Sequence, residues 1–149
     1  MRPFIALLVG SILLLSFTIL KPVIWLGDIN TATAEAAKSK ELILVNFSGS
    51  DWCGPCIRLR KEILESETFT NYAADHLVLV RADFPRQKKN QLDKEQVKRN
   101  EALADKYNPE GKFPFTLLID GQGKVLKTWD GFPNESPEQF TAQVKAFEK

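Results

Sequence analysis

Short apolar runs recur along the chain between polar stretches, and their lengths are typical of strands. Four of them are interpreted as strands, over residues 23–26, 42–47, 77–82 and 117–119, and the run 42–47 has the length of a buried strand. A further segment, 124–129, alternates apolar and polar residues as the edge strand of a sheet does. A glycine-containing turn joins the last two segments, so we expect them to form a hairpin.

Helical patterns fill most of the gaps between these strands. Apolar residues recur at roughly helical spacing from Ile57 to Leu64, so a helix should follow the second strand after a small polar loop. Alanine pairs predict a first helix over 31–38, and helical patterns also cover 67–72 and 93–107. The expected apolar contacts of the 93–107 helix are Val97, Leu103, Ala104 and Tyr107. The alternation of strands and helices predicts an α/β fold.

The last helix has the clearest start signal in the chain. Ser136 is followed by a proline at the first helical position and by Gln139 at the reciprocal position of a capping box. Phe140, Val144 and Phe147 follow at helical spacing, and we expect them to be the buried stripe of a helix packed on the sheet.

The N-terminal segment differs in composition from the rest. Arg2 precedes an uncharged apolar run over 4–20, which suits a secretory signal or a short membrane anchor. A buried core helix is the alternative, but the run is apolar on every face and begins near residue 1. We therefore expect an N-terminal signal or anchor over 1–21 and one folded domain over 22–149, exported to the periplasm or another extracytoplasmic face.

The small residues of 32–34 resemble a cleavage site, yet cutting there would remove the first strand and half of the first helix. This favours an uncleaved anchor, with membrane attachment through residues 4–20, over a secreted form.

The net charge of the chain is small, but one segment has an excess of basic residues. The net charge of +1 over 149 residues gives no reason to expect a nucleic acid partner. Residues 81–99 contain seven Lys or Arg against three Asp or Glu, around a polar loop over 83–92. A solvated surface explains this excess most simply, and a docking surface for an acidic partner or for anionic lipid is the alternative.

The candidate chemistry lies in the only two cysteines, Cys53 and Cys56, which follow the second strand. Cys53 should lie at or just before the first turn of the next helix, where free N–H groups stabilise a thiolate relative to a free thiol of pKa about 8.5. A pair spaced in this way is also compatible with half a zinc site or a structural disulfide. Zinc needs four protein ligands, and His76 is the only further soft one, so we expect no metal. His76 itself is interpreted as a surface residue.

The segment Trp52-Cys53-Gly54-Pro55-Cys56, on a strand-to-helix turn, resembles the active site of thioredoxins, and the resemblance extends from about Val23 to the end of the chain. It implies a thioredoxin-like three-layer α/β/α sandwich with a central mixed sheet. It also implies that Cys53 is the exposed attacking thiol, that Cys56 is the more buried resolving thiol, and that the two form a redox-active disulfide.

The resemblance assigns a further part of the site to the segment before the fourth strand. Phe113 and Pro114 match the place where thioredoxins have a cis proline opposite the dithiol, and the backbone of Phe113 would pair with a substrate strand. The loop 131–133 would lie near this site. The expected residues that bind substrate or shape the site are thus Trp52, Gly54, Pro55, Phe113 and Pro114.

One position departs from the thioredoxin pattern. Thioredoxins have a buried acid behind the dithiol, and the matching residue here is Asn46. An amide does no acid–base work, so the second step of the reaction would need a water or Asp51 instead.

The predicted function is thiol–disulfide exchange on protein disulfides outside the cytoplasm, without a cofactor. We favour a reductant that is recharged by a membrane or soluble thiol electron donor. The alternative is a binding or assembly module on the same fold with a non-catalytic disulfide.

Overall fold

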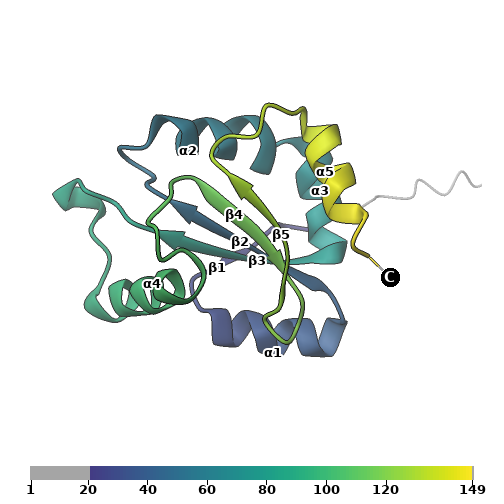
Figure 1. Cartoon of the computed structure of the whole chain (residues 1–149), viewed down its shortest axis with the longest axis horizontal. Helices are drawn as coiled ribbons and strands as arrows, with labels where there is room; N and C mark the ends of the chain where they lie inside the picture. Colours follow the sequence, from purple (N-terminus) through teal and green to yellow (C-terminus); the bar gives the residue numbers. More distant parts are fainter. Residues whose placement is uncertain (1–20, 149) are drawn as a thin grey trace, which may run out of the picture.

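A mixed five-stranded sheet separates two layers of helices in the computed structural model, which describes residues 21–148 (Figure 1). The strand order is β1-β3-β2-β4-β5, with β1, β3 and β2 parallel and with β4 and β5 antiparallel to their neighbours. The strands are β1 (Trp25–Leu26), β2 (Leu42–Ser48), β3 (Leu77–Asp83), β4 (Phe115–Ile119) and β5 (Val125–Asp130). The predicted three-layer α/β sandwich with a mixed sheet is confirmed.

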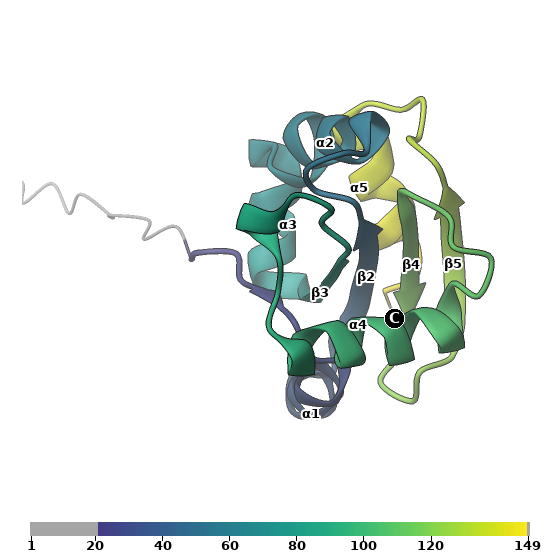
Figure 2. The same ribbon diagram turned by 90° about the vertical axis from the view of Figure 1, so that its left-hand side faces the viewer.

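Helices α2, α3 and α5 cover one face of the sheet, and α1 and α4 cover the other (Figures 1 and 2). The helical elements are α1 (Ile29–Ser39), α2 (Gly54–Leu59), the π-helical turn η1 (Arg60–Leu64), α3 (Glu67–His76), the 3-10 turn η2 (Lys88–Asn90), α4 (Lys94–Tyr107) and α5 (Pro137–Lys145). The predicted hairpin of the last two strands is also present.

The apolar core has two halves because successive strand residues point to opposite faces of the sheet. On one face Leu44 packs in a buried cluster with Phe69 and Phe140 from α3 and α5. On the other face Val45 packs in a second cluster that includes Leu103 from α4. The central strand β2 is therefore buried on both sides, and its C-terminal end positions the loop that carries the cysteines.

The first two elements differ from their predicted bounds. The first strand contains only Trp25 and Leu26, and Ile24 is 68% exposed. The first helix begins earlier than expected because the Asp28 side chain caps it and accepts a hydrogen bond of 2.9 Å from the Asn30 N–H.

Two residues that were predicted to be core contacts lie at the surface. Val97 is 38% exposed, because α4 turns Asn100 and Leu103 toward the protein interior instead. Phe147 is 36% exposed, because α5 ends at Lys145 and Phe147 follows it. The predicted capping box of α5 is confirmed, with the Gln139 N–H donating to Ser136 Oγ at 3.2 Å.

The predicted signal or anchor over 4–20 lies outside the described residues. Within 21–148, no helix has the length and apolar character that a membrane crossing requires.

Candidate redox-active site

Cys53 and Cys56 form a disulfide at the start of α2, with an S–S distance of 2.05 Å. Cys53 has extended backbone angles and is the N-cap of α2, as predicted. Its Sγ accepts a hydrogen bond of 3.3 Å from the Cys56 N–H, while Cys56 Sγ lies 3.5 Å from the Gly49 N–H, which donates to it. Each sulfur thus has one backbone donor, and such donors favour the thiolate over the thiol.

The two cysteines were expected to differ in exposure, but the difference in the structure is small. Cys53 is 5% exposed and Cys56 is 2% exposed, so the prediction of an exposed Cys53 is wrong for the disulfide state. The reason is that the Cys53 side chain turns back over the first helical turn, where it bonds to Cys56 and caps the helix. The space beside Gly54 is open, since apart from its chain neighbours and the backbone of α2 no atom lies within 4 Å of a β carbon added there.

The Trp52 side chain is held by residues from two other segments. Its indole Nε1 donates a hydrogen bond of 2.7 Å to the carbonyl of Phe84, just after β3. The ring lies against Gly49, where an added β carbon would clash with Trp52 Cε2. Only glycine allows this close approach, so Gly49 and Phe84 are site residues that the sequence did not indicate.

The cis peptide bond predicted at Phe113–Pro114 is present. Because Phe115 pairs with Phe47 near the end of β2, Pro114 lies beside the loop that leads to the cysteines. The Phe113 ring is 5.6 Å from the Trp52 ring and 5.4 Å from the Phe84 ring, so the three form an aromatic cluster.

The loop 131–133 adjoins the same site, as expected. The Gly131 N–H donates a hydrogen bond of 2.9 Å to the Pro114 carbonyl. From the other side, the Arg58 guanidinium of α2 lies 4.2 Å from the centroid of the Phe132 ring. The loop therefore bridges the cis proline and the helix that carries the dithiol.

Asn46 lies on β2 and is 3% exposed. Its Nδ2 donates a hydrogen bond of 3.0 Å to Thr116 Oγ1 on β4, so the amide is paired and neutral. The position therefore provides no group that titrates in the range in which thiols react.

Asp51, the alternative raised above for the acid–base role, is engaged by the loop that follows β3. Its carboxylate accepts hydrogen bonds from the Arg86 N–H at 2.9 Å and the Gln87 N–H at 3.0 Å, and a third from the Asn90 amide. The Arg86 N–H in particular holds the pKa of Asp51 below its usual value. Asp51 is thus an ionised anchor for the loop 86–90.

His76 lies at the opposite end of the sheet, at the junction of α3 and β3. Its Nδ1 is 2.9 Å from Glu148 Oε1, and its ring stacks on Tyr72 at 4.8 Å. Its surface location, 48% exposed, agrees with the prediction. Among residues 21–148, no three His, Cys, Asp or Glu side chains gather as a metal site would require.

The fold, the disulfide at a helix start and the adjacent cis proline define a thioredoxin-like redox protein. A sequence profile described as Thioredoxin-like matches residues 24–121, and the chain belongs to this family.

Two curated relatives and one solved structure are similar to this chain. The protein is 38% identical to a Chlamydia pneumoniae protein named Disulfide bond reductase DsbH over 104 residues, and these residues are 70% of this chain and 60% of that protein. It is 30% identical to the Thioredoxin-related protein DsbJ of the same organism over 115 residues, and these residues are 76% of this chain and 32% of that protein. The chain thus spans less than two thirds of either curated relative. A solved structure named DsbH Oxidoreductase matches with a TM-score of 0.78 at 30% identity, over 92% of both chains.

Proposed function

We propose that this protein is a thiol–disulfide oxidoreductase that reduces disulfides in protein substrates. The observation that carries the proposal is the Cys53–Cys56 disulfide, which caps α2 beside the cis Phe113–Pro114 bond. The relative DsbH is named a disulfide bond reductase, which supports this direction of electron flow.

The reaction follows from the arrangement of the two sulfurs. The Cys53 thiolate attacks one sulfur of the substrate disulfide, forms a mixed disulfide and releases the other sulfur, which takes a proton. Cys56 then loses its proton, attacks Cys53 Sγ, closes the Cys53–Cys56 bond and releases the second substrate thiol. Two electrons have passed from the dithiol to the substrate, and a membrane or soluble thiol donor restores the dithiol.

The surroundings of the dithiol assign roles to the remaining site residues. Trp52 and Phe113 provide an aromatic surface, and Gly54, between the two cysteines, faces open space. The Phe113 backbone pairs with an extended substrate segment before β4 begins. Because Asn46 is a paired amide, the proton of Cys56 leaves to water or to the departing substrate thiolate.

We also propose that the protein works outside the cytoplasm, attached through residues 4–20. The uncharged run after Arg2 supports this location, as do the names of the Dsb relatives. Carbonate extraction of membranes from cells that make the full chain tests it. The protein should stay in the membrane pellet, and its recovery only in the cytosol would contradict both the export and the anchor.

The reduction potential tests the proposed direction. Equilibration of the full chain with glutathione buffers should give a value near that of thioredoxins, about −270 mV. A value well above about −200 mV would identify an oxidant or isomerase instead. A binding module with a non-catalytic disulfide would keep its cellular function in a Cys53→Ser, Cys56→Ser double variant, whereas a reductase would lose it.

A further inference from the structure

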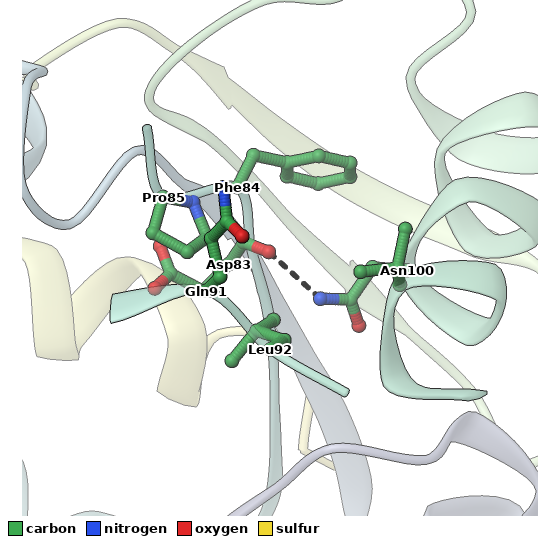
Figure 3. Close-up of a pocket in the computed structure, with 7 residues that line it drawn as sticks. Asp83, Phe84, Pro85, Gln91, Leu92 and Asn100 are labelled. Atoms are coloured by element: carbon green, nitrogen blue, oxygen red, sulfur yellow. Dashed lines mark hydrogen bonds between the residues drawn. The ribbon is translucent and has the colours of Figure 1, made fainter. Parts of the chain in front are cut away.

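A pocket of about 250 Å³ lies between the loop that follows β3 and helix α4. Figure 3 shows Phe84, Pro85 and Leu92 from the loop on one side and Asn100 of α4 on the other. Val97, which is 38% exposed, completes the α4 wall. Val97 is thus an apolar side chain on the solvent-facing side of α4 that borders the pocket.

The pocket is suited to an apolar group because its buried polar groups already have partners. Asp83 accepts hydrogen bonds from both the N–H and the hydroxyl of Ser50. Asn100 donates to the Asp83 carbonyl at 2.8 Å and accepts from Gln96 Nε2 at 2.8 Å. A polar ligand would therefore gain few hydrogen bonds here, whereas an apolar side chain would be removed from water.

The same loop is attached to the segment that carries the dithiol. Phe84 accepts the Trp52 indole hydrogen bond and contacts Phe113 through its ring. The backbone of Arg86 donates to Asp51, and the Arg86 guanidinium lies 3.6 Å from the centroid of the Trp52 ring. Phe84 is thus shared by the pocket and the aromatic cluster, so a molecule in the pocket would continue onto the surface beside Trp52.

The loop that lines the pocket carries several basic residues. Arg86, Lys88 and Lys89 lie in the exposed segment between the two parts of the loop that line the pocket, and Lys94 follows it. Across residues 21–148, no side chain of these four makes an ion pair within 4.0 Å. Among the acidic residues of the same region, Asp51 binds loop N–H groups, Asp93 caps α4 and Glu95 pairs with Lys98 at 3.1 Å. The segment 86–92 thus contains three basic residues and no acidic one, and it adjoins the residues that line the pocket.

We propose that this pocket and its rim, defined here as Phe84, Leu92, Val97, Lys88 and Lys89, form a substrate subsite. It binds an apolar side chain flanked by carboxylates, in the segment of a protein substrate near its disulfide. This inference rests on the proposed function and specifies its substrate class. A protein segment fits better than a lipid surface, because the apolar part is a concave pocket between a loop and a helix and is continuous with the site where substrate disulfides react.

Peptide disulfides provide the test. Each peptide has one cysteine joined to 2-nitro-5-thiobenzoate, and the release of this thiol measures the reaction with the reduced full chain. The dithiol gives two electrons, becomes the Cys53–Cys56 disulfide, and yields one peptide thiol and one nitrothiobenzoate. The peptides carry leucine with acidic residues, alanine with the same acidic residues, or leucine with lysines, at several spacings from the cysteine. Reaction with dithiothreitol corrects for their intrinsic reactivity.

We expect the acidic leucine peptide to react about tenfold faster than the lysine peptide at low salt, with the difference shrinking as salt is added. Lys88→Glu with Lys89→Glu should abolish this preference. The matched control is Lys38→Glu with Lys124→Glu, the same charge change at the opposite end of the sheet, which should retain it. Val97→Trp should fill the pocket and equalise the leucine and alanine peptides, whereas Val125→Trp, at an exposed position of β5, should not.

Equal rates for all peptides would overturn the subsite while leaving the proposed function intact. The same would follow if the control charge variant lost the preference as fully as the rim variant. If Lys88 and Lys89 instead increased binding to vesicles of phosphatidylglycerol and phosphatidylcholine, without any peptide preference, the rim would be a lipid contact and the subsite would be wrong. If dithiothreitol reduced every peptide and the protein reduced none, the proposed function would fail, and the subsite with it.

Discussion

The two sulfurs have different neighbours although both cysteines are buried. Cys53 precedes the helix, and its sulfur accepts a hydrogen bond from the Cys56 N–H. Cys56 lies within the first turn, and its sulfur accepts a hydrogen bond from the Gly49 N–H of the preceding loop. A substrate that approaches over the open Gly54 turn would meet Cys53 first. We therefore expect Cys53 to attack and Cys56 to resolve.

Trapping experiments distinguish these roles. Cys56→Ser should leave attack possible but block release, so mixed disulfides with substrate proteins should accumulate and disappear when dithiothreitol is added. Cys53→Ser should trap almost nothing. Non-reducing gels of cells that make each variant provide the measurement. Equal trapping by the two variants, or faster alkylation of Cys56 than of Cys53 at neutral pH, would contradict the assignment.

A second prediction concerns the buried amide behind the dithiol. In Asn46→Asp, burial should raise the pKa of the new carboxyl above its unfolded value of about 3.9. The folded state then binds more protons than the unfolded state, so stability falls as pH rises from the unfolded pKa through the folded one. By pH 7 we expect a loss of about 1–4 kcal/mol, if burial raises the pKa by roughly one to three units.

Urea unfolding of the oxidised protein at several pH values measures this effect. The control is Asn134→Asp at an exposed position, which should show little change. A variant whose stability relative to the parent protein does not vary between pH 4 and pH 8 would show that the position is not desolvated.

For individual residues, the sequence predicted the site residues next to the cysteines in the chain. It missed those that other segments bring to the site. Trp52, Cys53 and Cys56 form one local motif on a strand-to-helix turn, so their placement followed from the pattern. Gly49 and Phe84 were missed, because their roles depend on where the Trp52 ring lies in the folded protein. The engagement of Asp51 by the loop 86–90 was missed for the same reason.

Among the elements, the loop between β3 and α4 is fixed by a side chain from the dithiol loop. Asp51 accepts the N–H groups of Arg86 and Gln87, and these bonds lower its pKa below the reference value of 3.8. A depressed carboxyl pKa means that this contribution to stability is present above the unfolded pKa. It is lost as pH falls through the lower folded pKa.

Asp51→Ala should therefore release the loop without unfolding the domain. Amide hydrogen exchange at Arg86 and Gln87 should become several-fold faster, while exchange in β2 should stay slow. Asp105→Ala removes an equally charged, exposed residue of α4 and should leave both amides unchanged. Unchanged exchange at Arg86 in the Asp51→Ala protein would show that other contacts hold the loop.

Helix patterns were predicted better than helix details. The apolar residues after the dithiol fit a regular helix only approximately, and the structure resolves this with the π-helical turn Arg60–Leu64. The wider turn brings Leu59, Ile63 and Leu64 to the interior together, each 1% exposed. The sequence pattern contained this irregularity, but only packing against the sheet determines how the backbone accommodates it.

For the whole molecule, stability and redox direction are linked by a thermodynamic cycle. The disulfide can form in the folded or in the unfolded chain, and folding can occur with the cysteines oxidised or reduced. The proposed reductase function leads us to expect that folding lowers the reduction potential of the Cys53–Cys56 pair. In that case oxidation is more favourable in the folded state than in the unfolded one, so the oxidised protein is the more stable form. A strong oxidant shows the reverse, because its reduced form is stabilised.

We therefore expect the oxidised protein to unfold at a higher urea concentration than the protein reduced with dithiothreitol. Each 30 mV by which the folded pair is more reducing than the unfolded pair corresponds to about 1.4 kcal/mol of extra stability in the oxidised form. The unfolded reference is the potential of the same dithiol in denaturant. The Cys53→Ser, Cys56→Ser protein is the control, and dithiothreitol should not shift its midpoint. A reduced form that proves the more stable would contradict the expectation that folding makes the pair more reducing, because the cycle then requires the folded pair to be more oxidising than the same pair in denaturant.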